Sequence, residues 1–290
     1  MSELTQAPGL MDLLSASYGG DHWLVLEQRR DTLKRLYTLQ PAPELAWLFH
    51  NTPYAAMVDH SPLVVRVSHG SALLKAFAAG QGSAPLEGIL VSSTATSARV
   101  LAQLRKCLDI RFYTKRQALL RYYDPWVAAA FFSAKEPLDH WLGPLHRVIW
   151  FGGTFAQRAQ RGPSWYAFSA TTKPTATVDA DELPALSHHQ ERALENLLAD
   201  YPLWRHLIEH AALDETNAEH AKRFLSALSE AEHLSLPQQD VPEFLALRFA
   251  HFQAALPEAW EAQPADKRLA MLRQYVDTRE KQTPTERDGA

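Results

Sequence analysis

The sequence predicts an α/β N-terminal domain, a mixed sheet with flanking helices, followed by an all-α C-terminal domain. Short strand-like runs alternate with helical patterns from residue 22 to about 169, and only helical patterns follow from residue 188. Lys and Arg outnumber Asp and Glu by 18 to 13 in residues 1–180, but Asp and Glu outnumber them by 20 to 11 in residues 181–290. The two parts therefore have different surfaces, as separate modules do.

Six runs in the N-terminal part have the β-branched and aromatic composition of strands. They are "HWLVLEQ" (22–28), "PLVVRVS" (62–68), "LEGILVSS" (86–93), "IRFYT" (110–114), "ALLRYYD" (118–124) and "RVIWFGG" (147–153). Three segments between them have apolar residues at helical spacing, at 30–39, 71–80 and 97–108. Helical crossovers between the first strands and a hairpin between later ones predict a mixed sheet.

The C-terminal part lacks strand patterns. Residues 170–187 contain Thr, Pro and acidic residues with few large apolar ones, which is typical of an interdomain connection. Five amphipathic segments follow, at 188–201, 201–213, 217–234, 241–256 and 264–280. We therefore expect an α/β domain over 1–169, a linker over 170–187, a helical domain over 188–280 and a disordered tail over 281–290.

Composition limits the class of protein. Of the 290 residues, 46% are apolar and eight are Trp, which is enough for a sizeable core. A net charge of -4 gives no clustered basic excess, so nucleic acid is not an expected partner. The single cysteine, Cys107, excludes an intramolecular disulfide framework. Because there is no secretory leader pattern and no run of about 18 apolar residues, we expect a cytoplasmic protein without a membrane partner.

The stretch "ALLRYYDPWVAAAFF" joins a strand-like run to a helical one. Alternation along the strand places Arg121 and Tyr123 on one face and Tyr122 on the other. Asp124 then stands where a helix N-cap is expected, and Pro125 suits the first helical position because its φ is near the helical value and it has no N–H. The pattern favours a capping carboxylate at this position over a general acid or base.

A second junction, "WLGPLHRVIW", ends a helix at Gly-Pro and begins a strand near Arg147. Together with "RYYDPWVAAAFF" it resembles the pattern Arg-Phe-Tyr-Asp-Pro, then Phe-Gly-Pro and an apolar strand, of the domain-of-unknown-function family of type VI secretion effector adaptors, also called effector chaperones. The stretch "LFHNTPYAAMVDHSPLVVRVS" is similar to a further part of that family, and the resemblance spans about residues 20–155. By matching position, the signature residues are Arg121, Tyr122, Tyr123, Asp124, Pro125, Gly143 and Pro144.

The resemblance implies a non-enzymatic adaptor that needs no cofactor. Such a protein binds a toxin effector in the bacterial cytoplasm and helps to load it onto the VgrG spike of the secretion machine. Exposed aromatic side chains suit the centre of an interface, although residues of these types also fill cores. Trp126, Trp141 and Arg121 are the candidate partner contacts.

The sharpest chemical alternative is "HLIEH" at residues 206–210, which matches the H-x-x-E-H pattern of inverted zinc proteases. On a helix, His206 and His210 project from one face and can bind zinc, with Glu209 as general base. Candidates for the required third ligand are Glu230, Glu232, Glu243 and Glu258. An amphipathic helix with these polar residues on its solvated side explains the pattern equally, and the sequence favours it over a metal site.

Other catalytic motifs lack support. Cys107 lies on the apolar face of its predicted helix, as a buried small hydrophobic residue does, rather than in the setting of a nucleophile. The sequence contains no G-x-S-x-G elbow, Walker loop or G-x-G-x-x-G fingerprint. A zinc-dependent hydrolase and a generic protein-interaction module are the alternatives to the adaptor.

Overall fold

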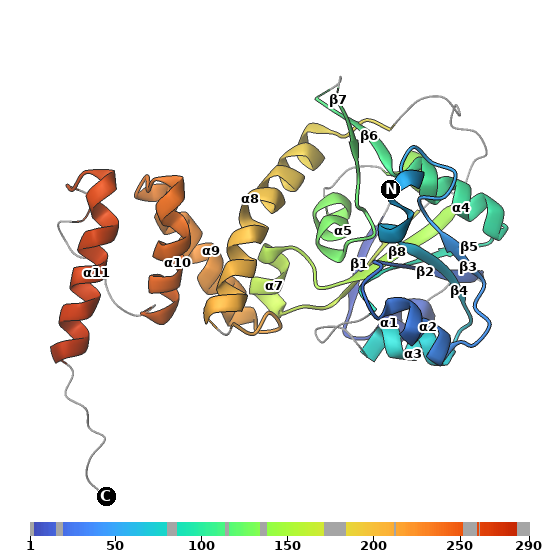
Figure 1. The fold of residues 1–290 in the computed structure, drawn as a ribbon, viewed down its shortest axis with the longest axis horizontal. Coiled ribbons are helices and arrows are strands. Elements are labelled where there is room, and N and C mark those ends of the chain that lie inside the picture. Colours follow the sequence, from blue (N-terminus) through green and yellow to red (C-terminus); the bar gives the residue numbers. More distant parts are fainter. Residues whose placement is uncertain are drawn as a thin grey trace, which may run out of the picture. The chain divides into compact units, whose positions relative to one another are not determined.

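The computed structural model describes residues 3–15, 20–79, 86–113, 116–133, 138–170, 184–211, 213–251, 260 and 262–282 (Figure 1). The chain divides into two compact units, residues 1–198 and 199–290. Most of the predicted linker, residues 171–183, and most of the predicted tail, residues 283–290, lie outside the described residues.

Seven strands of the N-terminal unit form one sheet in the order β1-β9-β8-β5-β2-β4-β3. Their bounds are β1 Glu3–Ala7, β2 Asp21–Leu26, β3 Leu45–Trp47, β4 Leu63–Val67, β5 Gly88–Ser93, β8 Leu145–Phe151 and β9 Trp165–Ser169. A second sheet consists of the predicted hairpin, β6 (Asp109–Phe112) and β7 (Arg116–Leu119). The hairpin is confirmed, but it stands apart from the main sheet.

The predicted fold class, a sheet with flanking helices followed by a helical region, is confirmed. Within the sheet, every neighbouring pair of the described strands is antiparallel, whereas the crossovers led us to expect some parallel neighbours. The reason is the position of β2. A crossover helix, α3 (Ala72–Ala79), joins β4 to β5, which run in the same direction, but β2 lies between them and is antiparallel to both.

Helices cover both faces of the sheet (Figure 1). One face packs on α1 (Leu10–Ser15), α2 (Thr32–Leu39) and α3. The other packs on α4 (Ser97–Lys106), α5 (Pro125–Phe132) and α6 (Asp139–Leu142), and α7 (Phe155–Arg161) follows β8. Because both faces are covered, the central strands β2, β5 and β8 are buried at nearly every position, and each contains a run of at least three consecutive apolar residues that the sequence reveals.

The helical part contains α8 (His188–Ala211), α9 (Ala218–His233), α10 (Val241–Ala250) and α11 (Ala265–Gln282). The prediction of two helices over 188–213 is wrong, because one helix continues through Pro202. Proline removes one backbone hydrogen bond from a helix but does not always end it. Trp204 is buried against Phe224, with ring centroids 5.1 Å apart.

Several elements have weak sequence signals and were not predicted: β1, α1, β3, α7, β9 and the 3-10 helix η1 (Ala55–His60). The strand β1 is a polar edge strand whose partner β9 lies about 160 residues further along the chain. The strand β9 is apolar at almost every position, so it shows no alternation.

A polar row crosses the sheet beneath α1. His22, Ser92, Arg147 and Ser169 are neighbours in register on β2, β5, β8 and β9, and all four are buried. His22 Nδ1 lies 2.8 Å from Ser92 Oγ. Arg147 donates from Nε to Ser169 Oγ at 2.9 Å and from Nη1 to the Leu13 carbonyl. Hydrogen bonds thus satisfy polar groups that would otherwise destabilise this end of the core.

This row predicts a pH-dependent stability. Burial, with His69 and Arg147 nearby, lowers the pKa of His22 below its ordinary value of 6.5, and Asp21 opposes the shift. The unfolded chain therefore binds a proton more readily than the folded one, so the free energy of unfolding decreases as the pH falls from 6.5 towards the folded-state pKa. In urea unfolding at pH 7.5 and 5.5, His22→Gln should lose less stability on acidification than the wild type. An equal loss in both proteins would contradict this role.

Candidate functional site

The signature residues Arg121 to Pro125 form the junction between β7 and α5. The strand ends at Leu119, and the Asp124 amide donates to the Arg121 carbonyl at 2.9 Å, so the residues between them form a turn. The prediction that the strand continues to residue 124 is therefore wrong. The capping prediction is confirmed: Asp124 Oδ1 accepts from the Trp126 amide at 2.8 Å, and Pro125 is the first helical residue.

The environment of the Asp124 carboxyl group has opposing effects on its charge. Burial raises its pKa above the ordinary value, while the hydrogen bond from the Trp126 amide and the charge of Arg121 lower it. A raised pKa is also found in general acids. Here the carboxylate already accepts a backbone hydrogen bond in the first turn of α5, which is the geometry of a cap.

Both tyrosines of the junction are buried, and they lie in the turn after β7, so the expectation that they occupy opposite faces of a strand is corrected. Tyr122 donates its hydroxyl to the Leu104 carbonyl of α4 at 2.7 Å, and its ring lies edge-on to Trp141 at 5.1 Å. Burial raises the pKa of Tyr122 and of Tyr123. Tyr122 links the junction to α4 and α6, and both phenols stay neutral at physiological pH.

Arg121 is the accessible member of the junction, with 47% of its side chain exposed. It pairs with Glu27, which directly follows β2, and its guanidinium lies 3.9 Å from the Asp124 carboxylate. Glu27 also pairs with Arg29 at 3.2 Å. Exposed ion pairs contribute little to stability, so this network mainly defines the charge pattern around the junction.

The second predicted junction, Gly143-Pro144, joins α6 to β8 as expected. Gly143 has φ +53°, a conformation that favours glycine, and an added Cβ would lie 2.6 Å from Gln103 Oε1. The Pro144 carbonyl accepts from Ser93 Oγ at 2.6 Å, which ties the start of β8 to the end of β5. The bond therefore connects the neighbouring strands β5 and β8 at the point where β8 begins.

The structure buries two of the three predicted partner contacts. Trp126 packs on Phe155 of α7, with centroids 4.7 Å apart, and the Arg158 guanidinium lies 3.9 Å from its ring. Trp141 is 2% exposed inside the core between the sheet and α5. Of the three, only Arg121 is accessible to a partner without rearrangement of the core.

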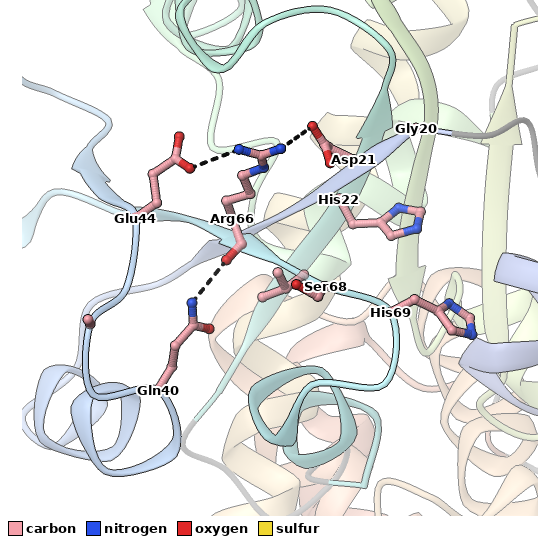
Figure 2. A pocket seen from close by; sticks show the side chains of 10 residues that line it. Gly20, Asp21, His22, Gln40, Glu44, Arg66, Ser68 and His69 are labelled. Atoms are coloured by element: carbon pink, nitrogen blue, oxygen red, sulfur yellow. Dashed lines mark hydrogen bonds and ion pairs between the residues drawn. The ribbon is translucent and has the colours of Figure 1, made fainter.

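A polar hollow of about 440 Å³ lies at the end of the sheet where β2 begins and β4 ends (Figure 2). Arg66 bridges two carboxylates there, Asp21 at 2.5 Å and Glu44 at 3.2 Å. His22 and His69 point away from this ion triad in Figure 2. No local sequence signal predicts the triad, because its members come from three separate segments. Because both carboxylates pair with the same guanidinium, the triad connects three segments of the fold, and the charge of Arg66 is not free to bind an anion.

The H-x-x-E-H segment lies on α8, and its two histidines share one helical face, with ring centroids 4.2 Å apart. Glu209 is paired with Arg205 at 2.9 Å. The candidate third ligands Glu230 and Glu243 are paired with Arg248 and Arg273, and Glu258 lies outside the described residues. The described part of the chain contains no group of three or more His, Cys, Asp or Glu side chains that could hold a metal ion.

Cys107 is buried as predicted, at 1% exposure. Burial raises the pKa of its thiol well above the ordinary value, so the thiolate that a nucleophile requires is suppressed. None of the described helices is long and apolar enough to cross a membrane.

Comparison with known proteins adds one finding. Residues 22–139 match the model of the domain of unknown function DUF4123, which is associated with type VI secretion effector adaptors. This match includes the Arg121–Pro125 junction and ends before Gly143. No curated protein and no solved structure matches the chain.

Replacing Asp124 tests its role as a helix cap. Asp124→Ala should lower the free energy of unfolding by about 1 kcal/mol, because α5 loses a side-chain cap. Asp124→Asn should keep it within about 0.5 kcal/mol, since Asn caps helices as well as Asp does. Urea unfolding measures both values. A loss as large for Asn as for Ala would show that the charge, and not the cap, is what the position requires.

Truncating Trp141 tests its place in the core. Trp141→Ala should lower the free energy of unfolding by about 3–5 kcal/mol, since a large buried aromatic side chain is removed. Tyr37→Ala on α2, where the side chain is 49% exposed, serves as control and should cost far less. Equal small losses in the two variants would contradict the packing described here.

Proposed function

We propose that the chain is a non-enzymatic adaptor. It binds a type VI secretion effector in the bacterial cytoplasm and helps to load it onto the VgrG spike. The match of residues 22–139 to a family associated with such adaptors carries this proposal. The adaptor would bind the free effector more tightly than the effector on the spike. It would hold an effector segment and shield its apolar surface until the effector joins the spike.

The uses of the signature residues support a binding role. The Asp124 carboxylate caps α5, and the Tyr122 hydroxyl donates a hydrogen bond to the Leu104 carbonyl of α4. Both polar groups therefore stabilise the fold of the domain. Neither stands in the polar hollow, whose ionic groups are paired with one another. Signature residues that stabilise the fold in this way hold the exposed surface of the domain in place for a partner, and they do not act as reactive groups themselves.

Co-purification tests the proposal most simply. The tagged chain and the effector encoded beside its gene are co-expressed, and the complex is isolated by affinity and size-exclusion chromatography. We expect a stable complex of the two proteins, and separately a complex that includes the VgrG spike protein. Recovery of the chain alone, with effector that is soluble and folded, would contradict the adaptor function.

The zinc-hydrolase alternative makes a different prediction. Metal analysis of the purified chain should find no stoichiometric zinc, and His206→Ala should not change the bound metal. Stoichiometric zinc that is lost in His206→Ala would favour the hydrolase over the adaptor.

A further inference from the structure

The two edges of the seven-stranded sheet differ in how their outer backbone groups are satisfied. At one edge, β3 has only three residues, and Arg105 of α4 donates to the carbonyls of Trp47 and Leu48, both at 3.2 Å. At the other edge, β1 has five residues in regular register with β9 and contains neither Lys nor Pro. Lys, Pro, bulges and covering elements are the usual protection of an edge strand against further pairing.

The hydrogen bonds of β9 show which groups of β1 point outward. Successive residues of a strand direct their N–H and C=O groups to opposite neighbours. The Ala170 amide donates to the His146 carbonyl of β8 at 2.9 Å. By alternation, Phe168 also bonds to β8, whereas Ser169 between them directs its N–H and C=O towards β1.

This pattern leaves two residues of β1 with outward backbone groups. Glu3 is opposite Ser169, so the odd-numbered residues of β1 bond to β9, and the N–H and C=O groups of Leu4 and Gln6 point away from the sheet. Within the described ranges, no hydrogen bond reaches these groups, which we call the β1 edge. Such an edge is a template on which an extended peptide adds as a further strand.

An apolar row that crosses the sheet ends in solvent at the β1 edge. Its members are neighbours in register on β2, β5, β8, β9 and β1, namely Trp23, Val91, Val148, Phe168 and Leu4. The first four are at most 3% exposed, whereas Leu4 is 39% exposed. Side chains that lie beside one another on neighbouring strands pack together. An added strand with an apolar side chain beside Leu4 would continue the row and cover its last member.

The chemistry of this surface favours a short extended segment over a second copy of the chain. Stable homodimers bury large and mainly apolar interfaces. If β1 paired with β1 of a second copy, each strand would contribute one exposed large apolar side chain, Leu4. A peptide that adds to a sheet edge gains its affinity from backbone hydrogen bonds and its specificity from a few side-chain contacts, which is what the β1 edge offers.

We infer that the β1 edge binds an extended segment of the effector as a further strand of the sheet, with an apolar side chain of that segment beside Leu4. This inference rests on the proposed adaptor function and specifies the surface that performs it.

A proline in β1 tests the backbone pairing. Gln6→Pro removes an outward N–H that the added strand requires. Proline is tolerated in edge strands where its nitrogen faces solvent, so the fold should persist by circular dichroism. The affinity for the purified effector, measured by calorimetry, should fall about ten-fold or more. Gln6→Ala is the matched control, because it keeps the N–H while it also loses the bond from Arg161 to Gln6 Oε1. Its affinity should equal that of the wild type.

A substitution at Leu4 tests the side-chain contact without changing any backbone group. Leu4→Lys places at the edge the residue type that opposes strand addition, so it should lower the affinity about ten-fold or more. Met57→Lys is the control. Met57 is 43% exposed in η1, which follows the opposite edge strand β3 and has no buried residue. This variant should bind the effector as the wild type does.

Hydrogen exchange measures the edge in the unmodified complex. The amides of Leu4 and Gln6 point outward in the free chain, and each should exchange about ten-fold or more slowly when the effector is bound, because the added strand accepts their hydrogen bonds. The amides of η1 should exchange at the same rate in the free chain and in the complex.

The outcomes separate this inference from the proposed function. Wild-type affinity in both Gln6→Pro and Leu4→Lys, or unchanged exchange at Leu4 and Gln6 in a complex that forms, overturns the β1 edge as the docking surface and leaves the adaptor function intact. Equal weakening in the variants and their controls also overturns it. A wild-type dimer that Gln6→Pro dissociates in size-exclusion chromatography would assign the edge to a second copy and overturn the effector segment as its occupant. Absence of effector binding by the wild-type chain overturns the proposed function itself.

Discussion

The hydrogen bond from the Trp126 amide to the Asp124 carboxylate determines where α5 begins, and the position of α5 determines much of the core on one face of the sheet. Its residues Phe131 and Phe132 pack against Trp141, and Phe132 also stacks on Trp150 of β8. Tyr122, two residues before the cap, holds α4 through its hydroxyl. One short turn thus aligns three helices with the sheet.

Most of the signature residues in this turn serve the interior of the domain. The Asp124 carboxylate caps α5, and the Tyr122 hydroxyl donates to the Leu104 carbonyl. Arg121 is the exception, because 47% of its side chain is exposed and it pairs with Glu27. Under the proposed function, the effector would contact Arg121 or surfaces built from other segments, so substitutions at Asp124 and at such surfaces should have different effects.

The sequence was informative wherever structure depends on near neighbours. The Asp124 cap bonds a residue two positions away, and Gly143 occupies a conformation that favours glycine, so both junctions could be predicted. Strand β1 could not, because it is polar and pairs with β9 at the other end of the domain. The ion triad around Arg66 and the exposure of Met57 likewise depend on which segments the fold brings together or leaves uncovered. Burial of Trp126 and Trp141 has the same origin, since composition alone does not separate core aromatic residues from interface ones.

The most direct test of this account is the affinity of Asp124→Asn for the effector, measured on protein shown to be folded. The account predicts wild-type affinity, because the amide preserves the helix cap, and the cap is the role that the account assigns to this carboxylate. A folded Asp124→Asn variant that no longer binds the effector would contradict it, since the charge itself would then belong to the functional surface.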